Sequence, residues 1–380
     1  MSVYQPIPST DIVATRTLLH EAIPITGSIV TASYGTWPDE ENIKNYSHGM
    51  FQSVYDYPYL SSSANHIFDI TLGYSSNSFA SASTSVQNAK KINIYNQMAQ
   101  VLAGYDQNNA IREFDEDGIY AGTTGETKIQ EAVFMTFSRL LVKDEIQKGT
   151  FELELGVRRN YRGANNSRIK IKDVSADSTF KVNSPTGEYG ILIASNSVGS
   201  NVLNNQVGTL AAGQKVGLIY YQAGVVVLSS SIFNDVALGG VLKNSEGALS
   251  MHSQSNGHVY ATPAEGQTIN SLLTGSQISA SADALRRRIY NVSFNNTIEL
   301  NSTIYFCRAS HNMFNFSGNP TYLNGSQIRT KASVDDVPVS YITTIGLYSP
   351  DNTLMAVGKL SEPIRKDPNI ELTFRARLDY

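Results

Sequence analysis

Alternating apolar and polar residues mark the carboxy-terminal segment as strands. In residues 372–380, LTFRARLDY, every second side chain from Leu372 to Tyr380 is apolar, so these side chains share one face, while the opposite face is charged. Two more strand patterns, 341–348 and 353–360, precede it around a turn at 349–352 that contains proline. We expect four of these side chains to lie in the core of a carboxy-terminal sheet: Tyr341, Phe374, Leu378 and Tyr380.

Helical spacing is clearest in residues 86–102. Apolar side chains recur there at intervals of three and four, and Gly104 follows as a stop signal. This pattern predicts one amphipathic helix with its apolar face turned inward. A second, short helix is expected over 283–288.

The remaining patterned segments are typical of strands. Residues 217–221 and 225–228 are apolar runs joined by a short turn that contains glycine, which predicts a hairpin. Residues 1–66 lack periodicity and are expected to be irregular, and the Ser-, Gly- and Asn-rich residues 244–280 are expected to form a loop or linker. The other predicted strands are 67–74, 131–142, 151–157, 169–172, 190–194 and 290–309.

These elements predict a predominantly β protein of the α+β class, with antiparallel sheets, sandwich-like domains and few helices. The chain has 380 residues, which exceeds the roughly 250–300 at which one core stops growing. We expect an amino-terminal α+β domain over 1–160, a β-rich middle domain or insertion over 161–280, and a carboxy-terminal β domain over 281–380.

The composition adds an unusually uncharged polar surface to this picture. Charged residues make up 16% of the chain, against about 25% in an average soluble domain, and tyrosine occurs 21 times. Such a surface can be buried against another chain at less desolvation cost than a charged one, and tyrosine suits interfaces. The composition therefore favours an assembly component, with an ordinary β-rich domain as the alternative. Within the aromatic stretch 46–59, we expect the interface anchors to be Tyr55, Tyr57 and Tyr59.

The net charge of −4 argues against a general nucleic-acid binder, which must neutralise many phosphates. We expect two short basic clusters to be solvated surface. One is formed by Arg158, Arg159 and Arg162, and the other by Arg286 to Arg288. Their alternative role is to contact phosphate or the carboxylates of a partner.

Cysteine and hydropathy patterns predict a soluble protein made in a reducing compartment. Cys307 is the single cysteine, in the apolar run 304–307, so we expect a buried thiol and no internal disulfide. Residues 1–11 do not resemble a secretory signal, and the longest apolar stretch, 216–228, is too short to span a bilayer. We expect no membrane insertion.

Motifs that would indicate a reaction centre are missing from the sequence. The six histidines are scattered, and the phosphate-binding loop GxxxxGK[ST] and the nucleophile elbow GxSxG do not occur. Asp115, Asp117 and Gly118 resemble part of a calcium loop, but Thr124 stands where the bidentate acid is required, so a polar turn is expected. We therefore expect no catalytic residue, no metal and no cofactor. A dispersed pair of carboxylates would permit glycoside hydrolysis, and tyrosine-rich loops would permit glycan binding.

Several segments resemble virion structural proteins of large contractile-tailed bacteriophages, in particular the T4-like phages of marine hosts. The similarity is carried most specifically by VSYITTIGLY at 339–348 and by the continuation LMAVGKLSEP at 354–363 and FRARLDY at 374–380. It extends to four other segments: NYSHGMFQSVYDYPYL at 45–60, FCRA at 306–309, FNFS at 314–317 and NPTY at 319–322.

The resemblance implies a non-enzymatic structural subunit of the virion, synthesised in the cytoplasm of the bacterial host. Its place would be the neck, the tail or baseplate, or the capsid periphery, and we favour the tail and baseplate region. Its partners would be other virion proteins and copies of itself. A fibre-associated protein that binds a host receptor or glycan is the alternative, and a particle-borne hydrolase is a third hypothesis. The resemblance carries no catalytic residues, so none are assigned.

Overall fold

The structure is a computed structural model in which two compact units can be distinguished. It describes residues 4–30, 40–82, 87–120, 128–137, 145–156, 168–174, 176–196, 214–233 and 278–380. Unit 1 consists of Met1–Leu18 and Glu299–Tyr380, and unit 2 consists of Leu19–Ile298. Strands β1 (Ile12–Thr26) and β15 (Ile289–Ala309) each contribute residues to both units.

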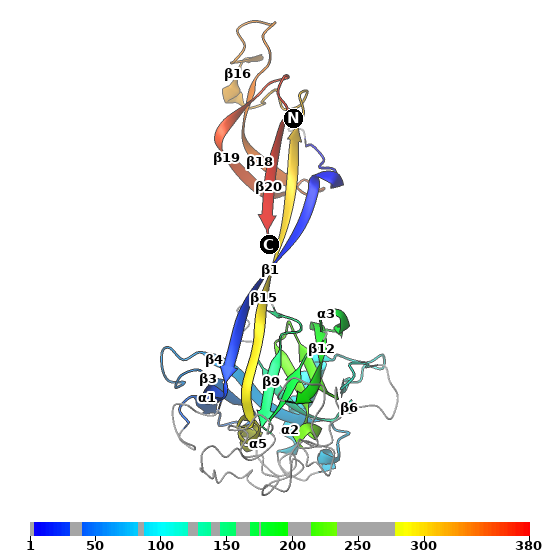
Figure 1. Cartoon of the computed structure of the whole chain (residues 1–380). Coiled ribbons are helices and arrows are strands. Elements are labelled where there is room, and N and C mark those ends of the chain that lie inside the picture. The colour runs from blue at the N-terminus through cyan, green and yellow to red at the C-terminus, as the bar shows by residue number, and fades with distance from the viewer. Residues whose placement is uncertain are drawn as a thin grey trace. The chain divides into compact units, whose positions relative to one another are not determined.

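Unit 2 is built on one antiparallel sheet (Figure 1). Starting from the first half of β15, the strand order is β9, β10, β12, β13, β14, β7, β4, β3 and β2, with β11 beside β12 and β8 beside β15. The bounds of these strands are β2 Ile43–Asn45, β3 Gln52–Tyr55, β4 His66–Tyr74, β7 Glu131–Thr136, β8 Glu145–Ile146, β9 Glu152–Gly156, β10 Arg168–Lys172, β11 Lys181–Ser184, β12 Gly187–Asn196, β13 Lys215–Tyr220 and β14 Val225–Ser229. A separate pair is formed by β5 (Phe114–Asp115) and β6 (Lys128–Ile129).

The central hairpin of unit 2 confirms the turn predicted after residue 221. β13 and β14 pair in register from Gly217 opposite Leu228 to Tyr220 opposite Val225. Their residues from Val216 onward are buried on both faces, which explains why these strands read as continuous apolar runs rather than as alternating ones. The hydrophobic core of the described chain surrounds this hairpin, and all its members lie between residues 25 and 294.

One long helix, α2 (Asn88–Leu102), packs on β4 and confirms the predicted amphipathic helix. The packing is close because β4 carries Gly73, where a β-carbon would lie 2.6 Å from the backbone oxygen of Lys91. The helix ends where Gly104 adopts a φ of 79° and donates its N–H to the carbonyl oxygen of Ala99, an arrangement that glycine favours.

The other helical elements are short. α5 (Ile278–Arg286) starts earlier than the predicted helix at 283–288 and packs against β3 and β4. The remaining elements are single turns, namely α1 Gly27–Val30, α3 Ala176–Thr179 and the 3₁₀ turns Ser9–Asp11, Phe79–Ala82, Ser230–Phe233 and Pro320–Tyr322.

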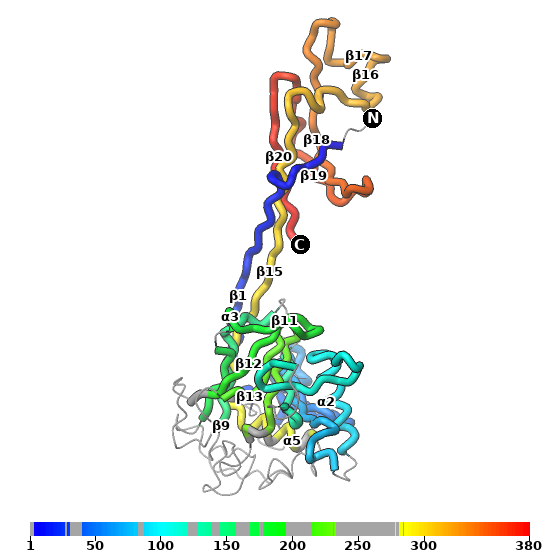
Figure 2. Tube along the Cα trace, turned by 90° about the vertical axis from the view of Figure 1, so that its right-hand side faces the viewer, coloured from blue at the N-terminus to red at the C-terminus, as the bar shows by residue number. Residues whose placement is uncertain are grey.

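Unit 1 contains a three-stranded arrangement and a long hairpin. β15 lies between β1 and β20 (Leu372–Asp379), as the ribbon shows (Figure 1). The Cα trace follows the same three segments from a second side (Figure 2). The hairpin consists of β18 (Ser340–Tyr348) and β19 (Leu354–Lys366), and a small pair is formed by β16 (Leu323–Asn324) and β17 (Gln327–Ile328). The three predicted carboxy-terminal strands are confirmed, and the last of them pairs with β15 over eight positions.

The predicted fold class is confirmed, because the described chain is mostly strand and its large sheet is antiparallel. Residues 1–66, expected to be irregular, contain β1, β2 and β3, so that expectation is wrong. The two units also differ from the three predicted segments. The boundary expected near residue 160 falls between β9 and β10, which pair in one sheet, and unit 1 joins both ends of the chain. The predicted loop at 244–280 lies outside the described residues except for its last three positions.

Candidate subunit interface

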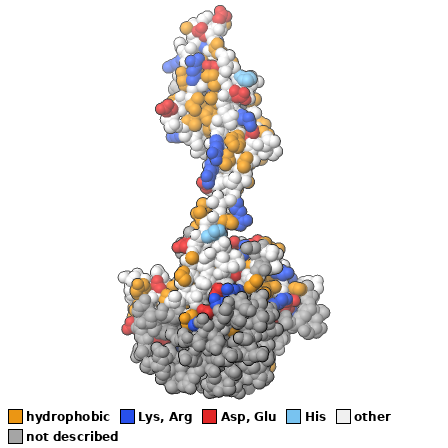
Figure 3. Space-filling view, viewed as in Figure 1, with side chains coloured by type: hydrophobic (Ala, Val, Ile, Leu, Met, Phe, Trp, Pro, Cys, Tyr) orange, Lys and Arg blue, Asp and Glu red, His pale blue; other side chains and the backbone are white. Residues whose placement is uncertain are grey.

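Unit 1 leaves nearly half of its described large apolar side chains exposed. The described chain has 25 exposed large hydrophobic residues, and 16 of them belong to unit 1, although unit 2 is much the longer of the two. Three hydrophobic residues of unit 1 are buried: Ile304, Ala309 and Ile328. Figure 3 shows hydrophobic side chains, in orange, at the surface of this unit. Its described residues therefore form strands without enclosing a core of their own.

The four side chains predicted as core of the carboxy-terminal sheet show the same lack of a covering layer. Exposure alternates along β20 as predicted, but Phe374 and Leu378 are only half-buried. Tyr341 is 47% exposed and Tyr380 is 75% exposed, so the prediction that these two belong to the core is wrong for the single chain. The alternation indicates which side chains share a face, whereas burial also requires a second layer over that face.

The most closely packed exposed group in unit 1 is the hairpin patch, which we define as Tyr4, Tyr348, Leu354 and Val357. The rings of Tyr4 and Tyr348 meet edge to face with centroids 4.8 Å apart. Val357 stands opposite Gly346 in the β18–β19 register. A β-carbon at Gly346 would lie 2.9 Å from the ring of Tyr348 and 3.3 Å from the side chain of Leu354, so both cover the glycine. All four side chains are between 45% and 55% exposed.

The largest buried side chain near the base of the hairpin is polar. Lys366, at the end of β19, is fully buried, and its Nζ donates to Oδ1 of Asn315 at 2.7 Å and to the carbonyl oxygen of Asp367 at 2.9 Å. The ammonium group thereby ties the loop after β15 to the hairpin. Hydrogen bonds of this kind help to order the backbone of unit 1.

The predicted anchors Tyr55, Tyr57 and Tyr59 lie at the end of β3 and in the loop that follows. Tyr55 and Tyr59 are half-buried with ring centroids 6.0 Å apart, and Tyr55 meets the ring of His66 edge to face at 5.3 Å. Tyr57 is 48% exposed. The structure thus brings two of the three together within the chain and leaves the third at the surface. Their role as interface anchors stays a prediction.

A second aromatic group lies beside these tyrosines in the turn that connects β2 to β3. The rings of Tyr46 and His48 stack at 5.1 Å, and Phe51 contacts both. The Nζ of Lys44 lies over the ring of Tyr46 at 4.8 Å and over that of Tyr59 at 5.6 Å. We call these residues together with Tyr55 and Tyr59 the β3 aromatic cluster. Since β2 is the last strand in the sheet order, the cluster lies at a sheet edge.

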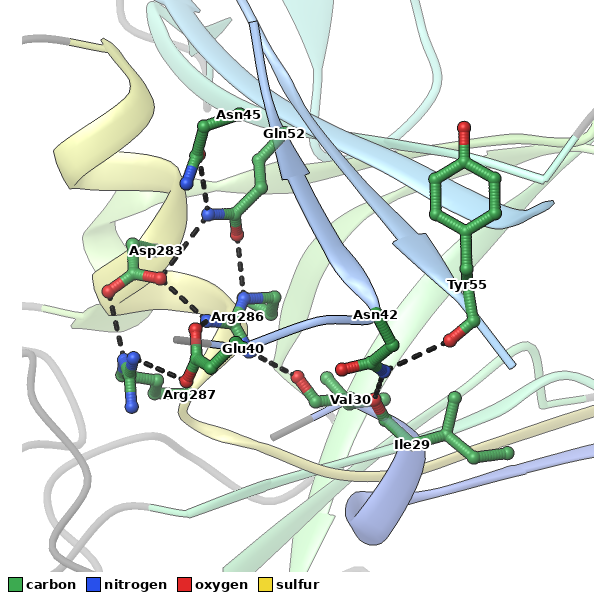
Figure 4. Close-up of polar contacts among 10 residues, drawn as sticks. All are labelled: Ile29, Val30, Glu40, Asn42, Asn45, Gln52, Tyr55, Asp283, Arg286 and Arg287. Carbon is green, nitrogen blue, oxygen red and sulfur yellow. Dashed lines mark hydrogen bonds and ion pairs between the residues drawn. The ribbon is translucent and has the colours of Figure 1, made fainter. Parts of the chain in front are cut away.

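The basic cluster at 286–288 is buried, so the expectation of a solvated surface is wrong. Arg286 is fully buried in a network with Glu40, Asp283 and Arg287 (Figure 4). Arg286 Nη2 lies 2.7 Å from Oε2 of Glu40 and 2.6 Å from Oδ1 of Asp283. Arg287 lies 2.5 Å from the other oxygen of Glu40 and 2.8 Å from the other oxygen of Asp283. Each carboxylate bridges both guanidinium groups, so the four charges are balanced.

Neutral groups complete this network. Arg286 Nε donates to Oε1 of Gln52 at 2.6 Å, and Arg286 Nη1 donates to the carbonyl oxygen of Val30. Burial alone would raise the pKa of Asp283, but the two guanidinium groups outweigh it and hold that pKa below its usual value. The network therefore fixes α5 to β3 and to the segment before β2. The other predicted basic cluster, at 158–162, lies outside the described residues.

Other titratable groups lie inside unit 2 without forming a common centre. Burial raises the pKa of Asp173 to about 6, although the N–H of Gly149 and the hydroxyl of Tyr221 both donate to its Oδ2. Asp115 accepts from Lys128 Nζ at 2.5 Å and the adjacent Gly118 has a φ of 69°, which confirms the predicted polar turn. In unit 1, Cys307 is half-buried rather than buried, and burial raises the pKa of its thiol. Among the described residues, no group of three or more His, Cys, Asp or Glu is placed to hold a metal ion.

Within the part of the chain that the structure describes, no helix is long and apolar enough to cross a membrane. No protein-family model, curated protein or solved structure matches this chain.

Proposed function

We propose that this chain is a non-enzymatic structural subunit of a tailed-phage virion, in the tail, baseplate or neck region, that acts through protein–protein interfaces. The observation that carries the proposal is the exposure of apolar side chains in unit 1. Permanent interfaces are more hydrophobic than ordinary protein surface, and aromatic anchors dominate their energy. A unit whose strands lack a covering layer is suited to assembly because neighbouring subunits can supply that layer.

The resemblance at both ends of the sequence supports the same function. The segments 339–348 and 354–363 that carry it form β18 and β19, the strands of the hairpin patch. The partners would be other virion proteins and copies of this chain, in a particle assembled from proteins made in the host cytoplasm. Symmetric particles repeat one interface many times, so a single surface of this kind would be used in every copy.

The proposal predicts that purified particles of the phage that encodes this chain contain it at a fixed copy number. Quantitative mass spectrometry against the major capsid protein should give a ratio set by particle symmetry, constant between gradient fractions of intact particles. Host proteins that co-purify serve as the control, because their ratio to capsid protein should vary between fractions. Absence of the chain from intact particles would refute the proposal.

A fibre-associated protein that binds a receptor or glycan is the second candidate, and the β3 aromatic cluster favours it. Aromatic faces at a sheet edge, with Tyr57 exposed nearby, could stack on sugar rings. If this candidate is right, the purified protein should bind components of the host envelope on a glycan array, and Tyr57→Ala should weaken the signal. The matched control is Tyr105→Ala, since Tyr105 of unit 2 is similarly exposed, at 51%. Equal signals from both variants would count against a glycan site at this edge.

A further inference from the structure

We propose that the hairpin patch of unit 1 is covered by unit 1 of other copies of this chain, so that the protein forms a homo-oligomer through this unit. This inference deepens the proposed function and rests on its premise that unit 1 acts through an interface. It commits the patch to one partner, namely the chain itself, which is present at equal concentration wherever the chain is made.

One face of the β18–β19 hairpin has no covering layer within the described chain. Isolated two-stranded hairpins are marginal in water, and strands acquire stability when a hydrophobic face is covered. The hairpin of β18 and β19 is one such two-stranded sheet, with Tyr348, Leu354 and Val357 on its uncovered face. The hydrophobic core of the described residues includes no member of unit 1. Copies of the chain that pack through their hairpins would provide the covering layer.

The exposed aromatic side chains of unit 1 provide surface area for an interface. Six aromatic side chains of unit 1 are between 40% and 75% exposed: Tyr4, Phe314, Phe316, Tyr341, Tyr348 and Tyr380. Since an aromatic side chain can bury roughly 150–250 Å², these six leave roughly 500–800 Å² of aromatic surface uncovered across the unit, and the hairpin patch contributes roughly 150–250 Å² of it through Tyr4 and Tyr348. A stable interface needs about 800 Å² from each partner. The aliphatic side chains of the same unit, including Met355 at 70% exposed, extend the surface toward that size.

Unit 1 has no net charge. Unit 1 contains nine Lys and Arg residues and nine Asp and Glu residues, so its net charge is zero, and the −4 of the whole chain resides in unit 2. Charges of unit 1 pair internally, as Arg308 does with Asp11 at 2.7 Å and Arg377 with Asp379 at 2.6 Å. Copies of a neutral unit can approach without the repulsion that like-charged surfaces impose. The hairpin patch itself contains no charged side chain.

The first test compares the full chain with a patch variant by analytical ultracentrifugation. The wild type should sediment as an oligomer at micromolar concentration. The double variant Tyr348→Ser/Leu354→Ser should raise the dissociation constant at least about 30-fold, which is the effect of removing one strong anchor. The control Val101→Ser/Val182→Ser removes two apolar side chains of unit 2 that are more exposed than those of the patch, and it should leave the oligomer unchanged.

The second test keeps the aromatic and leucine side chains of the patch, and it is practicable because the chain has a single cysteine to replace. In a Cys307→Ala background, Val357→Cys should cross-link copies with a bifunctional maleimide, whereas Val182→Cys in unit 2 should not. A monomeric wild type, or an oligomer that survives the double variant and gives no Val357→Cys cross-link, would overturn the inference. If the purified chain is a monomer but is present in particles, a different virion protein would cover the patch. That result would overturn the inference and leave the proposed function standing.

Discussion

Replacing Arg286 by methionine is expected to lower the free energy of unfolding of unit 2 by about 3–5 kcal/mol. Methionine retains much of the volume but removes the guanidinium group that faces both Glu40 and Asp283. The two carboxylates would then share one buried cation, Arg287, and Oε1 of Gln52 would lose the N–H that it accepts. Breaking a buried pair is costly because the charge left behind is neither paired nor solvated.

Urea unfolding of the full chain, followed by far-UV circular dichroism, measures this change. The control is Lys172→Met. Lys172 pairs with Glu152 and is more exposed than Arg286, and Lys170 still pairs with Glu152 in this variant. Its effect should stay within about 1 kcal/mol. Equal effects of the two substitutions would mean that the network around Arg286 is no more important than a surface ion pair.

The network should also make the effect of Arg286→Met depend on pH. The pKa of Asp283 is lowered in the folded state from its ordinary 3.8. A carboxyl with a lowered folded-state pKa stabilises the fold above its unfolded pKa, and this stabilisation is lost as the pH falls through the folded-state value. The difference in stability between wild type and variant should therefore be full near neutral pH and shrink below pH 3.8.

Deleting Phe374–Tyr380 is expected to make the protein insoluble. The deletion removes six of the eight β20 residues that pair with β15 and uncovers the edge of β15 along Ser302–Cys307. This edge includes the uncharged run Ile304–Cys307, and an exposed apolar edge strand is a template for pairing with other chains. The protein should move from the supernatant to the pellet after expression and centrifugation.

The control for the deletion is Tyr380→Ser, which shortens one exposed side chain and keeps the backbone. The N–H of residue 380 donates to the carbonyl oxygen of Asn301 at 2.9 Å, and this bond does not depend on the side chain. The control should remain soluble. A soluble deletion variant of wild-type oligomeric state would show that β20 is not needed to protect β15.

Local patterns predicted those elements whose signal is itself local. Helix α2 follows from apolar spacing and the glycine stop, and the β13–β14 hairpin follows from two apolar runs around one turn. β1 was missed because adjacent Leu18 and Leu19, and Pro24, interrupt any period-two alternation along its sequence. Its pairing with β15 brings together residues nearly 300 positions apart, for which a single sequence contains no signal.

The candidate site was predicted in part, for similar reasons. The predicted alternation of exposed and half-buried side chains in 372–379 is confirmed. The exposure of Tyr341 and Tyr380 could not be predicted, because it depends on whether another layer covers the sheet. The cluster at 286–288 was read as solvated because three adjacent arginines usually are. Its partner Glu40 lies 246 positions away, and nothing in the sequence near either segment indicates the pairing.

The pairing of the two chain ends in unit 1 also governs when this unit can fold during synthesis. Asp11 and Arg308, which bind each other, are separated by 297 positions, so the amino-terminal strand must wait until the ribosome has made most of the chain. Contacts of such long range form slowly. Nascent chains stalled before residue 372 would lack β20 and could not complete unit 1. If the proposed function is right, such truncated products would lack the surface through which the chain assembles.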